Sequence, residues 1–310
     1  MPSTERTSKL IKLILANPRG FCAGVNMAIE CVEEALKIVG APIYIYHEIV
    51  HNRHVVSHFV KKGVIFVDKI DEVPPDSMVI FSAHGVSPEV RHRARDRGCR
   101  MIDATCPLVT KVHTEAIRYS RQGYKILLIG HAGHDEVVGT VGEAPDAITI
   151  VESTKDVDNL QFSPNVKLAY LTQTTLSMDD ANRIIQAIKK KFPNVKQPPS
   201  EDICYATTNR QHAVRLLAAE ADLVLVVGSK NSSNSVRLTE ISENTGTPAY
   251  LVDDVTGIDA TWFTGVETVL VTAGASAPEY LVQNIVRDLI QNFDVQVEES
   301  TTVEENMHFS

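Results

Sequence analysis

The sequence predicts an α/β protein made of three similar αβα domains with mostly parallel sheets, arranged as a ring. Three observations lead to this prediction. Short apolar segments alternate with amphipathic helical segments along the chain. The same order of elements recurs three times with a period of about 90 residues, which indicates an internal repeat. A cysteine stands at the same point of each repeat, directly ahead of a predicted helix.

The predicted strands are continuous apolar runs, which is the pattern of parallel strands buried on both faces. They are Leu10–Leu15, Ile43–Tyr46, Val64–Val67, Met78–Phe81, Ile126–Ile129, Ile148–Val151, Leu168–Leu171, Leu223–Val227, Ala249–Val252 and Thr268–Val271, and Cys99 opens a further one. The segments between them repeat their apolar residues at helical spacing. After Cys22, for example, Val25, Ile29, Val32 and Leu36 fall on one face of a helix.

The repeat places the domain boundaries. We expect a first domain over residues 17–104, a second over 105–200 and a third over 201–297. The strand at 10–16 has no repeat before it, so we expect it to complete the third domain and close the ring. Residues 298–310 are acidic and polar, and we expect them to form a flexible tail.

Composition excludes several classes of partner. The 310 residues carry a formal net charge of −9, which argues against nucleic acid or an anionic membrane surface. No apolar run approaches the ~20 residues of a membrane span. The polar segment 1–9 lacks the features of a secretory signal. We therefore expect a cytoplasmic protein whose cysteines stay reduced.

Six polar loops follow predicted strands at their carboxyl ends, where parallel sheets bind their ligands. The loops begin at His47, Ser82, Gly130, Thr172, Gly228 and Thr272. Any single Ser or Asn in them is explained by helix capping. The set of six, with histidine in three loops, instead favours a phosphate or diphosphate site. The sequence contains neither the G-x-x-x-x-G-K-[ST] nor the G-x-G-x-x-G motif, so nucleotide binding is not predicted.

Three of the five cysteines are candidate metal ligands. Cys22, Cys106 and Cys204 hold equivalent positions, and a helix N-terminus stabilises a thiolate. We interpret Cys31 and Cys99 as small apolar residues. Three thiolates admit structural zinc in a Cys₃His set or an iron–sulfur cluster. The absence of close C-x₂₋₄-C pairs favours the cluster, in which one iron would lack a protein thiolate and could bind substrate.

The motifs around these residues resemble the 4-hydroxy-3-methylbut-2-enyl diphosphate reductase family. The resemblance extends from about Leu13 to Gln291 and is carried by nine segments. They are residues 16–25 (Ala-Asn-Pro-Arg-Gly-Phe-Cys-Ala-Gly-Val), 50–52, 81–87, 103–109 (Asp-Ala-Thr-Cys-Pro-Leu-Val), 130–136, 172–175, 203–211 (Ile-Cys-Tyr-Ala-Thr-Thr-Asn-Arg-Gln), 227–235 and 272–276. The first ten residues and the acidic tail carry no such motif.

The resemblance implies a specific site. The three domains would surround one [4Fe–4S] cluster per chain, with Cys22, Cys106 and Cys204 as ligands and one open iron. Glu136 would be the proton donor, and Thr174, in the other polar loop of the same domain, is placed to relay the proton. The implied substrate-binding residues, which act mostly through the diphosphate, are His51, His84, His134, Thr174, Ser232, Ser233, Asn234 and Ser276.

The implied reaction is a two-electron reductive removal of an allylic hydroxyl. It is the last step of the non-mevalonate isoprenoid pathway, yields isopentenyl and dimethylallyl diphosphates, and takes its electrons from a ferredoxin or flavodoxin. Three alternatives remain at this stage: a non-redox iron–sulfur dehydratase, a redox sensor with a labile cluster, and a Cys₃ zinc hydrolase. A sensor would need neither the six polar loops nor Glu136.

Overall fold

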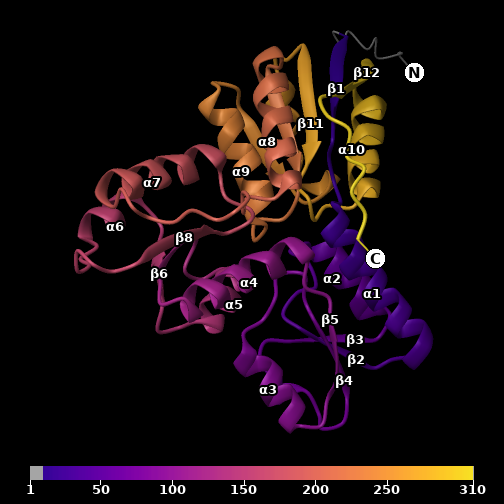
Figure 1. Ribbon diagram of the computed structural model, residues 1–310. Helices are drawn as coiled ribbons and strands as arrows, with labels where there is room; N and C mark the ends of the chain where they lie inside the picture. The colour runs from indigo at the N-terminus through magenta and orange to yellow at the C-terminus, as the bar shows by residue number, and fades with distance from the viewer. Residues whose placement is uncertain (1–9, 310) are drawn as a thin grey trace, which may run out of the picture. The chain divides into compact units, whose positions relative to one another are not determined.

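The computed structural model describes residues 10–309 and contains three parallel sheets, as predicted (Figure 1). The strands follow in the order in which they pair. Sheet A consists of β10 (Ala249–Val252), β9 (Leu223–Val227), β11 (Thr268–Ala273), β1 (Ile11–Asn17) and β12 (Val295–Thr301). Sheet B consists of β3 (Val64–Val67), β2 (Ile43–Tyr46), β4 (Met78–Phe81) and β5 (Arg100–Asp103). Sheet C consists of β7 (Ile148–Val151), β6 (Lys125–Ile129) and β8 (Leu168–Thr172). The N-terminal segment 1–9 lies outside the described residues.

The three sheets share one strand order. In each of them the first strand along the repeat, β2, β6 or β9, lies between the second and the third. A fourth strand follows the third: β5 in sheet B and β1 in sheet A. In sheet C this place holds a single parallel bridge between Ala169 and Lys196. The internal repeat seen in the sequence is therefore a repeat of topology.

Contacts along the chain define two compact units. Unit 1 consists of residues 10–22, 51–53 and 208–306 and contains sheet A. Unit 2 consists of residues 23–50, 54–207 and 307–309 and contains sheets B and C. The division into three domains at residues 104 and 200 remains a prediction.

Helices cover both faces of sheet A. On one face, Leu13 and Leu15 of β1 pack with α10 (Glu279–Asn292). On the other face, Ile14 and Ala16 pack with α8 (Tyr205–Leu217) and α9 (Ser233–Asn244). Successive residues of β1 thus point into two different cores, which explains why this strand is continuously apolar from Leu13 to Ala16.

Sheet C is built in the same way. One face packs with α4 (Pro107–Arg121) and α5 (Asp135–Glu143), and the other with α6 (Thr154–Asn159) and α7 (Met178–Lys191). Near sheet B the chain forms α1 (Ala23–Val39), α2 (Arg53–Lys61) and α3 (Pro88–Asp96). Short 3₁₀ helices occupy Ile70–Glu72, Ala218–Glu220, Val255–Gly257 and Ala260–Phe263. None of the helices in the described part of the chain has both the length and the apolar character needed to span a membrane.

The end of the chain differs from the sequence prediction. Residues 298–301, expected to belong to a flexible tail, lie in β12, which pairs in parallel with β1 from Ile11 to Asn17 (Figure 1). Beyond the strand, Glu305 accepts hydrogen bonds from Arg210. For residues 298–301 the prediction was wrong because β12 is an edge strand whose side chains are mostly exposed, and so its sequence lacks the apolar run that marks a central strand.

Candidate functional site

The six predicted polar loops leave the strands at the carboxyl ends. Two of them follow neighbouring strands in each sheet: β2 and β4 in sheet B, β6 and β8 in sheet C, β9 and β11 in sheet A. Because all these strands are parallel, the two loops of each sheet emerge at the same edge. Each sheet therefore presents one pair of polar loops, as the sequence predicted.

The three candidate ligand cysteines make the same backbone hydrogen bond. In each case the cysteine N–H donates to the carbonyl of the second residue beyond the neighbouring strand. The bond joins Cys106 to Ala83 O at 3.0 Å, Cys204 to Thr174 O at 3.0 Å, and Cys22 to Ala275 O at 3.3 Å. Each carbonyl belongs to a polar loop, so every cysteine is fixed directly to a loop that carries predicted substrate-binding residues.

The surroundings of these thiols fit an iron–sulfur cluster, which proteins bind through thiolates. Each cysteine directly precedes a helix: α1, α4 or α8. All three are partly accessible, and none of the five cysteines, which all lie in the described residues, forms a disulfide. Gly24 keeps space beside Cys106, because a Cβ atom there would lie 2.5 Å from its Sγ. In contrast, burial raises the pKa of the Cys31 and Cys99 thiols, which disfavours their thiolate forms.

Glu136 and Thr174 form a buried pair in unit 2. Thr174 donates its backbone N–H to Glu136 Oε1 at 2.7 Å and its hydroxyl to Oε2 at 2.9 Å. Both side chains are almost inaccessible, at 2% and 4%. Burial raises the pKa of Glu136 from its ordinary 4.5 to about 7, although the bonds from Thr174 oppose the shift. A carboxyl with this pKa holds and releases a proton near neutral pH.

His134 caps the helix on which Glu136 lies. Its Nδ1 accepts a hydrogen bond from the Glu136 backbone N–H at 3.2 Å. The proton of the neutral imidazole therefore lies on Nε2, which makes that nitrogen a hydrogen-bond donor. The ring of His84, from the loop after β4, lies edge-on to it at 5.9 Å between centroids. Two predicted substrate-binding histidines from different sheets are thus neighbours within unit 2.

Asp135, which neighbours Glu136, has a different partner. Its Oδ1 lies 2.7 Å from Nδ1 of His47, and this hydrogen bond raises the pKa of His47. His47 adopts a left-handed backbone conformation with φ of 59° at the end of β2. Asp135 is therefore engaged in an ion pair and Glu136 in a buried hydrogen-bonded pair, which supports the choice of Glu136 as the acid.

The loops of sheet A bring together hydroxyl groups in unit 1. Ser232, the N-cap of α9, lies 3.3 Å from the hydroxyl of Ser276, and Ser276 donates to the backbone carbonyl of His51 at 2.9 Å. Asn234 accepts from the Ala275 N–H at 3.0 Å and so ties the two loops together. Ser233 is the half-buried first residue of α9. These predicted residues cluster at a helix N-terminus, a position that favours anions.

Sequence reasoning missed Ser235, which organises this cluster. Its side chain is fully buried, and it donates both its N–H and its hydroxyl to Ser232 Oγ, at 3.3 and 3.0 Å. A Cβ atom at Gly228 or Gly274 would lie 2.2 or 1.9 Å from its hydroxyl oxygen. Glycine at both strand ends therefore lets the two loops close around one serine. The signal in the sequence was this glycine pair.

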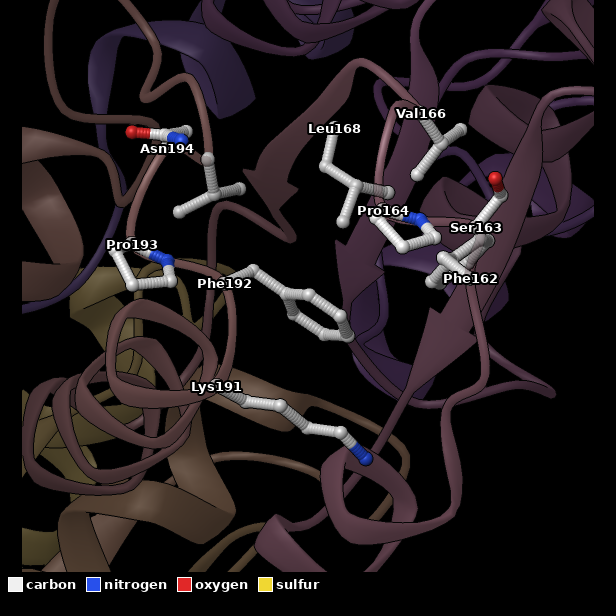
Figure 2. Close-up of a pocket in the computed structure, with 10 residues that line it drawn as sticks. Phe162, Ser163, Pro164, Val166, Leu168, Lys191, Phe192, Pro193 and Asn194 are labelled. Atoms are coloured by element: carbon white, nitrogen blue, oxygen red, sulfur yellow. The ribbon is translucent and has the colours of Figure 1, made fainter.

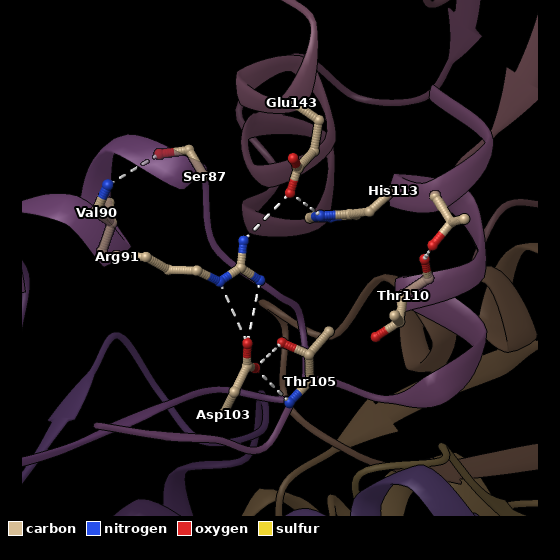
Figure 3. A network of polar contacts seen from close by, with 9 residues as sticks. Ser87, Val90, Arg91, Asp103, Thr105, Thr110, His113 and Glu143 are labelled. Carbon is tan, nitrogen blue, oxygen red and sulfur yellow. Dashed lines mark hydrogen bonds and ion pairs between the residues drawn. The ribbon is translucent and has the colours of Figure 1, made fainter. Parts of the chain in front are cut away.

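A second network, in unit 2, supports the Cys106 segment (Figure 3). Asp103 accepts from the Thr105 N–H at 3.1 Å and pairs with Arg91. Arg91 also reaches Glu143 of α5, which lies 2.9 Å from Nδ1 of the buried His113. Burial opposes ionisation of Glu143, but His113 and Arg91 outweigh it and lower the Glu143 pKa. His113 thus joins α4, which Cys106 directly precedes, to α5, on which Glu136 lies.

A pocket of about 290 Å³ lies elsewhere in unit 2 (Figure 2). It is lined by residues of the segment that leads into β8, up to Leu168, and by residues 191–195 at the end of α7 and just after it, among them Phe162 and Phe192. These segments adjoin the amino end of β8, whereas Thr174 follows its carboxyl end. The pocket contains none of the predicted site residues, so it does not change the assignment.

Comparison with known proteins decides the family. Residues 13–290 match the family model described as LytB protein. The chain belongs to the LytB protein family. It is 56% identical over 299 residues to the 4-hydroxy-3-methylbut-2-enyl diphosphate reductase of Rhodopirellula baltica, which covers 96% of this chain and 94% of the relative. The reductase of the same name from Azotobacter vinelandii is 56% identical over 300 residues, with 96% and 95% covered.

Solved structures of the family have the same fold. The E-1-hydroxy-2-methyl-but-2-enyl-4-diphosphate reductase from Plasmodium falciparum matches with a TM-score of 0.94 and 45% identity, over 96% of this chain and 94% of that one. A structure of (E)-4-hydroxy-3-methyl-but-2-enyl diphosphate reductase, described as the terminal enzyme of the non-mevalonate pathway, matches with a TM-score of 0.65 and 32% identity. It covers 92% of this chain and all of that one. The family recognised from the motifs is confirmed, and with it an oxidoreductase with an iron–sulfur cluster. The roles of single residues remain predictions.

The raised pKa of Glu136 predicts a titration that can be observed directly. The infrared carbonyl band of a protonated carboxyl should disappear with a midpoint near pH 7, because Glu136 is buried. Since this pKa lies above that of the unfolded chain, the stability that Glu136 contributes is complete below about pH 4.5 and is lost as the pH rises through about 7. The band should be absent from Glu136→Gln and unchanged in the control Asp135→Asn. A midpoint near 4.5 would contradict the assignment.

Proposed function

We propose that this chain converts (E)-4-hydroxy-3-methylbut-2-enyl diphosphate to isopentenyl and dimethylallyl diphosphates by two-electron reductive dehydroxylation. One observation carries the proposal: the buried Glu136–Thr174 pair lies in the loop pair whose backbone also anchors Cys204. An acid beside a thiolate ligand is what the reductive removal of a hydroxyl requires. Family membership supports the same reaction.

We further propose that Cys22, Cys106 and Cys204 hold a [4Fe–4S] cluster with one iron left without a protein ligand. Their identical backbone anchors and their place ahead of three helices support this set. The helix N-termini favour the negative charge of thiolates and of a thiolate-bound cluster. When bound, the cluster supplies electrons one at a time and an iron that polarises the hydroxyl.

The chain's own residues handle the protons. The net reaction takes up two electrons and two protons: the C–O bond breaks, one proton makes the departing oxygen water, and the other ends on carbon. Protonated Glu136 donates to the Thr174 hydroxyl, 2.9 Å away, and Thr174 passes its own proton to the departing oxygen. The pair is buried, so this proton is held away from bulk water until it is used.

The diphosphate is recognised by neutral donors. Ser232, Asn234 and Ser276 supply hydroxyl and amide groups at the N-terminus of α9. His134 offers its Nε2–H, and we include His51, His84 and Ser233 in the same role. Donors of this kind bind an anion without a fixed lysine or arginine, because the helix N-terminus supplies the positive potential. We expect a ferredoxin or flavodoxin to deliver the electrons, since the sequence has no dinucleotide motif.

The first test of this proposal is the ligand set. Cys22→Ser, Cys106→Ser and Cys204→Ser should each purify without oxygen with much less iron and sulfide and with little activity. Cys31→Ser is the matched control and should keep both, because Cys31 lies inside α1. Zinc without sulfide in the parent protein would instead indicate the zinc hydrolase, and loss of the cluster in Cys31→Ser alone would contradict the assignment.

The second test concerns the acid. Glu136→Gln should keep its cluster but turn over roughly 10²–10⁴-fold more slowly, the usual loss for a general acid. Substrate affinity should change little, since the amide still accepts a hydrogen bond from Thr174. Turnover is measured anaerobically with a reduced dye and with the iron content checked first. Near-normal turnover by Glu136→Gln would show that Glu136 only caps α5. For the parent protein, turnover without a reductant would indicate a dehydratase, and no turnover despite a full iron content would indicate a sensor.

The third test concerns the diphosphate. Ser232→Ala should weaken the binding of inorganic diphosphate by roughly 1–3 kcal/mol, as for the loss of a hydrogen bond to a charged group. Calorimetry measures this, and circular dichroism checks the fold because Ser232 also caps α9. Ser242→Ala is the control: Ser242 is buried on the same helix but bonds to Thr247 O. Equal affinities in the two variants would remove Ser232 from the site.

A further inference from the structure

The loop ahead of Cys22 is held by the end of the chain. We call residues 295–305 the C-terminal segment. Its strand β12 pairs with β1 up to Asn17, opposite Thr301. The Asn17 side chain donates to Thr301 Oγ1 at 3.1 Å, and the Asn17 carbonyl accepts from the Thr302 N–H at 2.8 Å. The backbone that leads to Cys22 therefore starts from a point fixed by the C-terminal segment.

Arg19 adds a second attachment within unit 1. Its guanidinium, which is only 10% exposed, pairs with Glu299 of β12 at 2.9 Å and with Glu279 of α10 at 2.8 Å. Burial opposes the charge, but the two carboxylates outweigh it and raise the pKa of Arg19. Arg19 also donates to the Ala16 carbonyl at 3.0 Å. Arg19 thus links the turn between β1 and Cys22 both to the end of β1 and to β12.

Arg210 makes the third attachment. It lies on α8, which begins directly after Cys204, and its side chain is 1% exposed. It donates to the carbonyl of Gly20, two residues before Cys22, at 2.7 Å, and to Glu305 at 3.0 Å. Asn209 donates to the same carboxylate at 3.0 Å. A buried guanidinium without a counter-charge is strongly destabilising, so Glu305 stabilises the ion that holds Gly20 in place.

The other two cysteine segments are held by carboxylates that lie close to the cysteine in the sequence, Asp103 and Asp202. Asp103, paired with Arg91, accepts from the Thr105 N–H beside Cys106. Asp202, paired with Lys111, accepts from the Thr172 N–H and stands two residues ahead of Cys204. Only for Cys22, among the described residues, does the corresponding carboxylate come from the C-terminal segment. That segment also lies beyond residue 290, where the match to the family model ends.

We propose that Arg210 and Glu305 are positioning residues for Cys22, and that the C-terminal segment is a strap that sets how firmly the chain retains its iron–sulfur cluster. This inference rests on the proposed role of Cys22 as a ligand. Neither residue touches the substrate in this scheme. They act through the Gly20 carbonyl, which fixes the loop on which the Cys22 thiol is presented.

The test compares two neighbouring acidic residues. Glu305→Gln removes the counter-charge of Arg210, whereas Glu304→Gln removes the same charge from an exposed position and is the matched control. In air, the visible absorbance of the cluster should decay about tenfold faster in Glu305→Gln than in the parent, while Glu304→Gln decays at the parent rate. The thermal midpoint of the cluster-free chain should also fall in Glu305→Gln, which leaves Arg210 without its counter-charge, and should stay at the parent value in Glu304→Gln. A purely structural role would lower that midpoint and leave the decay rate unchanged, which would overturn the proposal.

A shortened chain provides an independent variant. A stop codon at position 304 removes Glu305 but leaves β12 intact, and it should reproduce the faster decay. Parent-like decay in both Glu305→Gln and the shortened chain would overturn the strap, with the cluster assignment unaffected. The proposed function fails separately, if the parent itself contains no iron and sulfide after anaerobic purification.

Discussion

One backbone hydrogen bond, made three times, underlies the whole arrangement. The N–H of each proposed ligand cysteine donates to a carbonyl in the neighbouring polar loop, and the register of parallel strands places that carbonyl. The same loops carry Thr174, Ser276 and, beside Ala83, His84. A displacement of a strand therefore moves a proposed ligand thiol and a proposed substrate donor together. In the proposed site, such coupling would make the distance between the cluster and the substrate insensitive to small changes in the sheet.

The fold was predictable where burial on both faces produces continuous apolar runs. Leu223–Val227 is fully buried and was recognised at its observed bounds. The same reasoning failed at the edge of sheet A, where β12 exposes Glu298 and Glu299 and is held by main-chain pairing to β1. Pairing of this kind leaves no periodicity in the side chains. An edge strand rich in charge is read as a tail unless its partner is known.

The sequence indicated which loops form the candidate site, but it did not indicate the residues that hold these loops in place. Position after a strand indicated the loops that carry Glu136 and Thr174, because strand order places both loops at one edge, and the family resemblance supplied the roles proposed for these two residues. Two supporting features were missed: Ser235, which is enclosed by two glycines, and Arg210 with its counter-ion Glu305. A fully buried arginine has no signature in a single sequence, since its burial depends on a carboxylate supplied by another segment.

The position of β1 has a consequence for synthesis of the protein. Its neighbours in sheet A, β11 and β12, are the last strands of the chain, so β1 emerges from the ribosome long before either partner exists. At roughly 5–20 residues per second, this delay lasts on the order of ten seconds or more. During that time an apolar strand with two unsatisfied edges is exposed, which is the usual starting point of aggregation. The yield of native protein should therefore depend on how well the cell protects its first strand during translation.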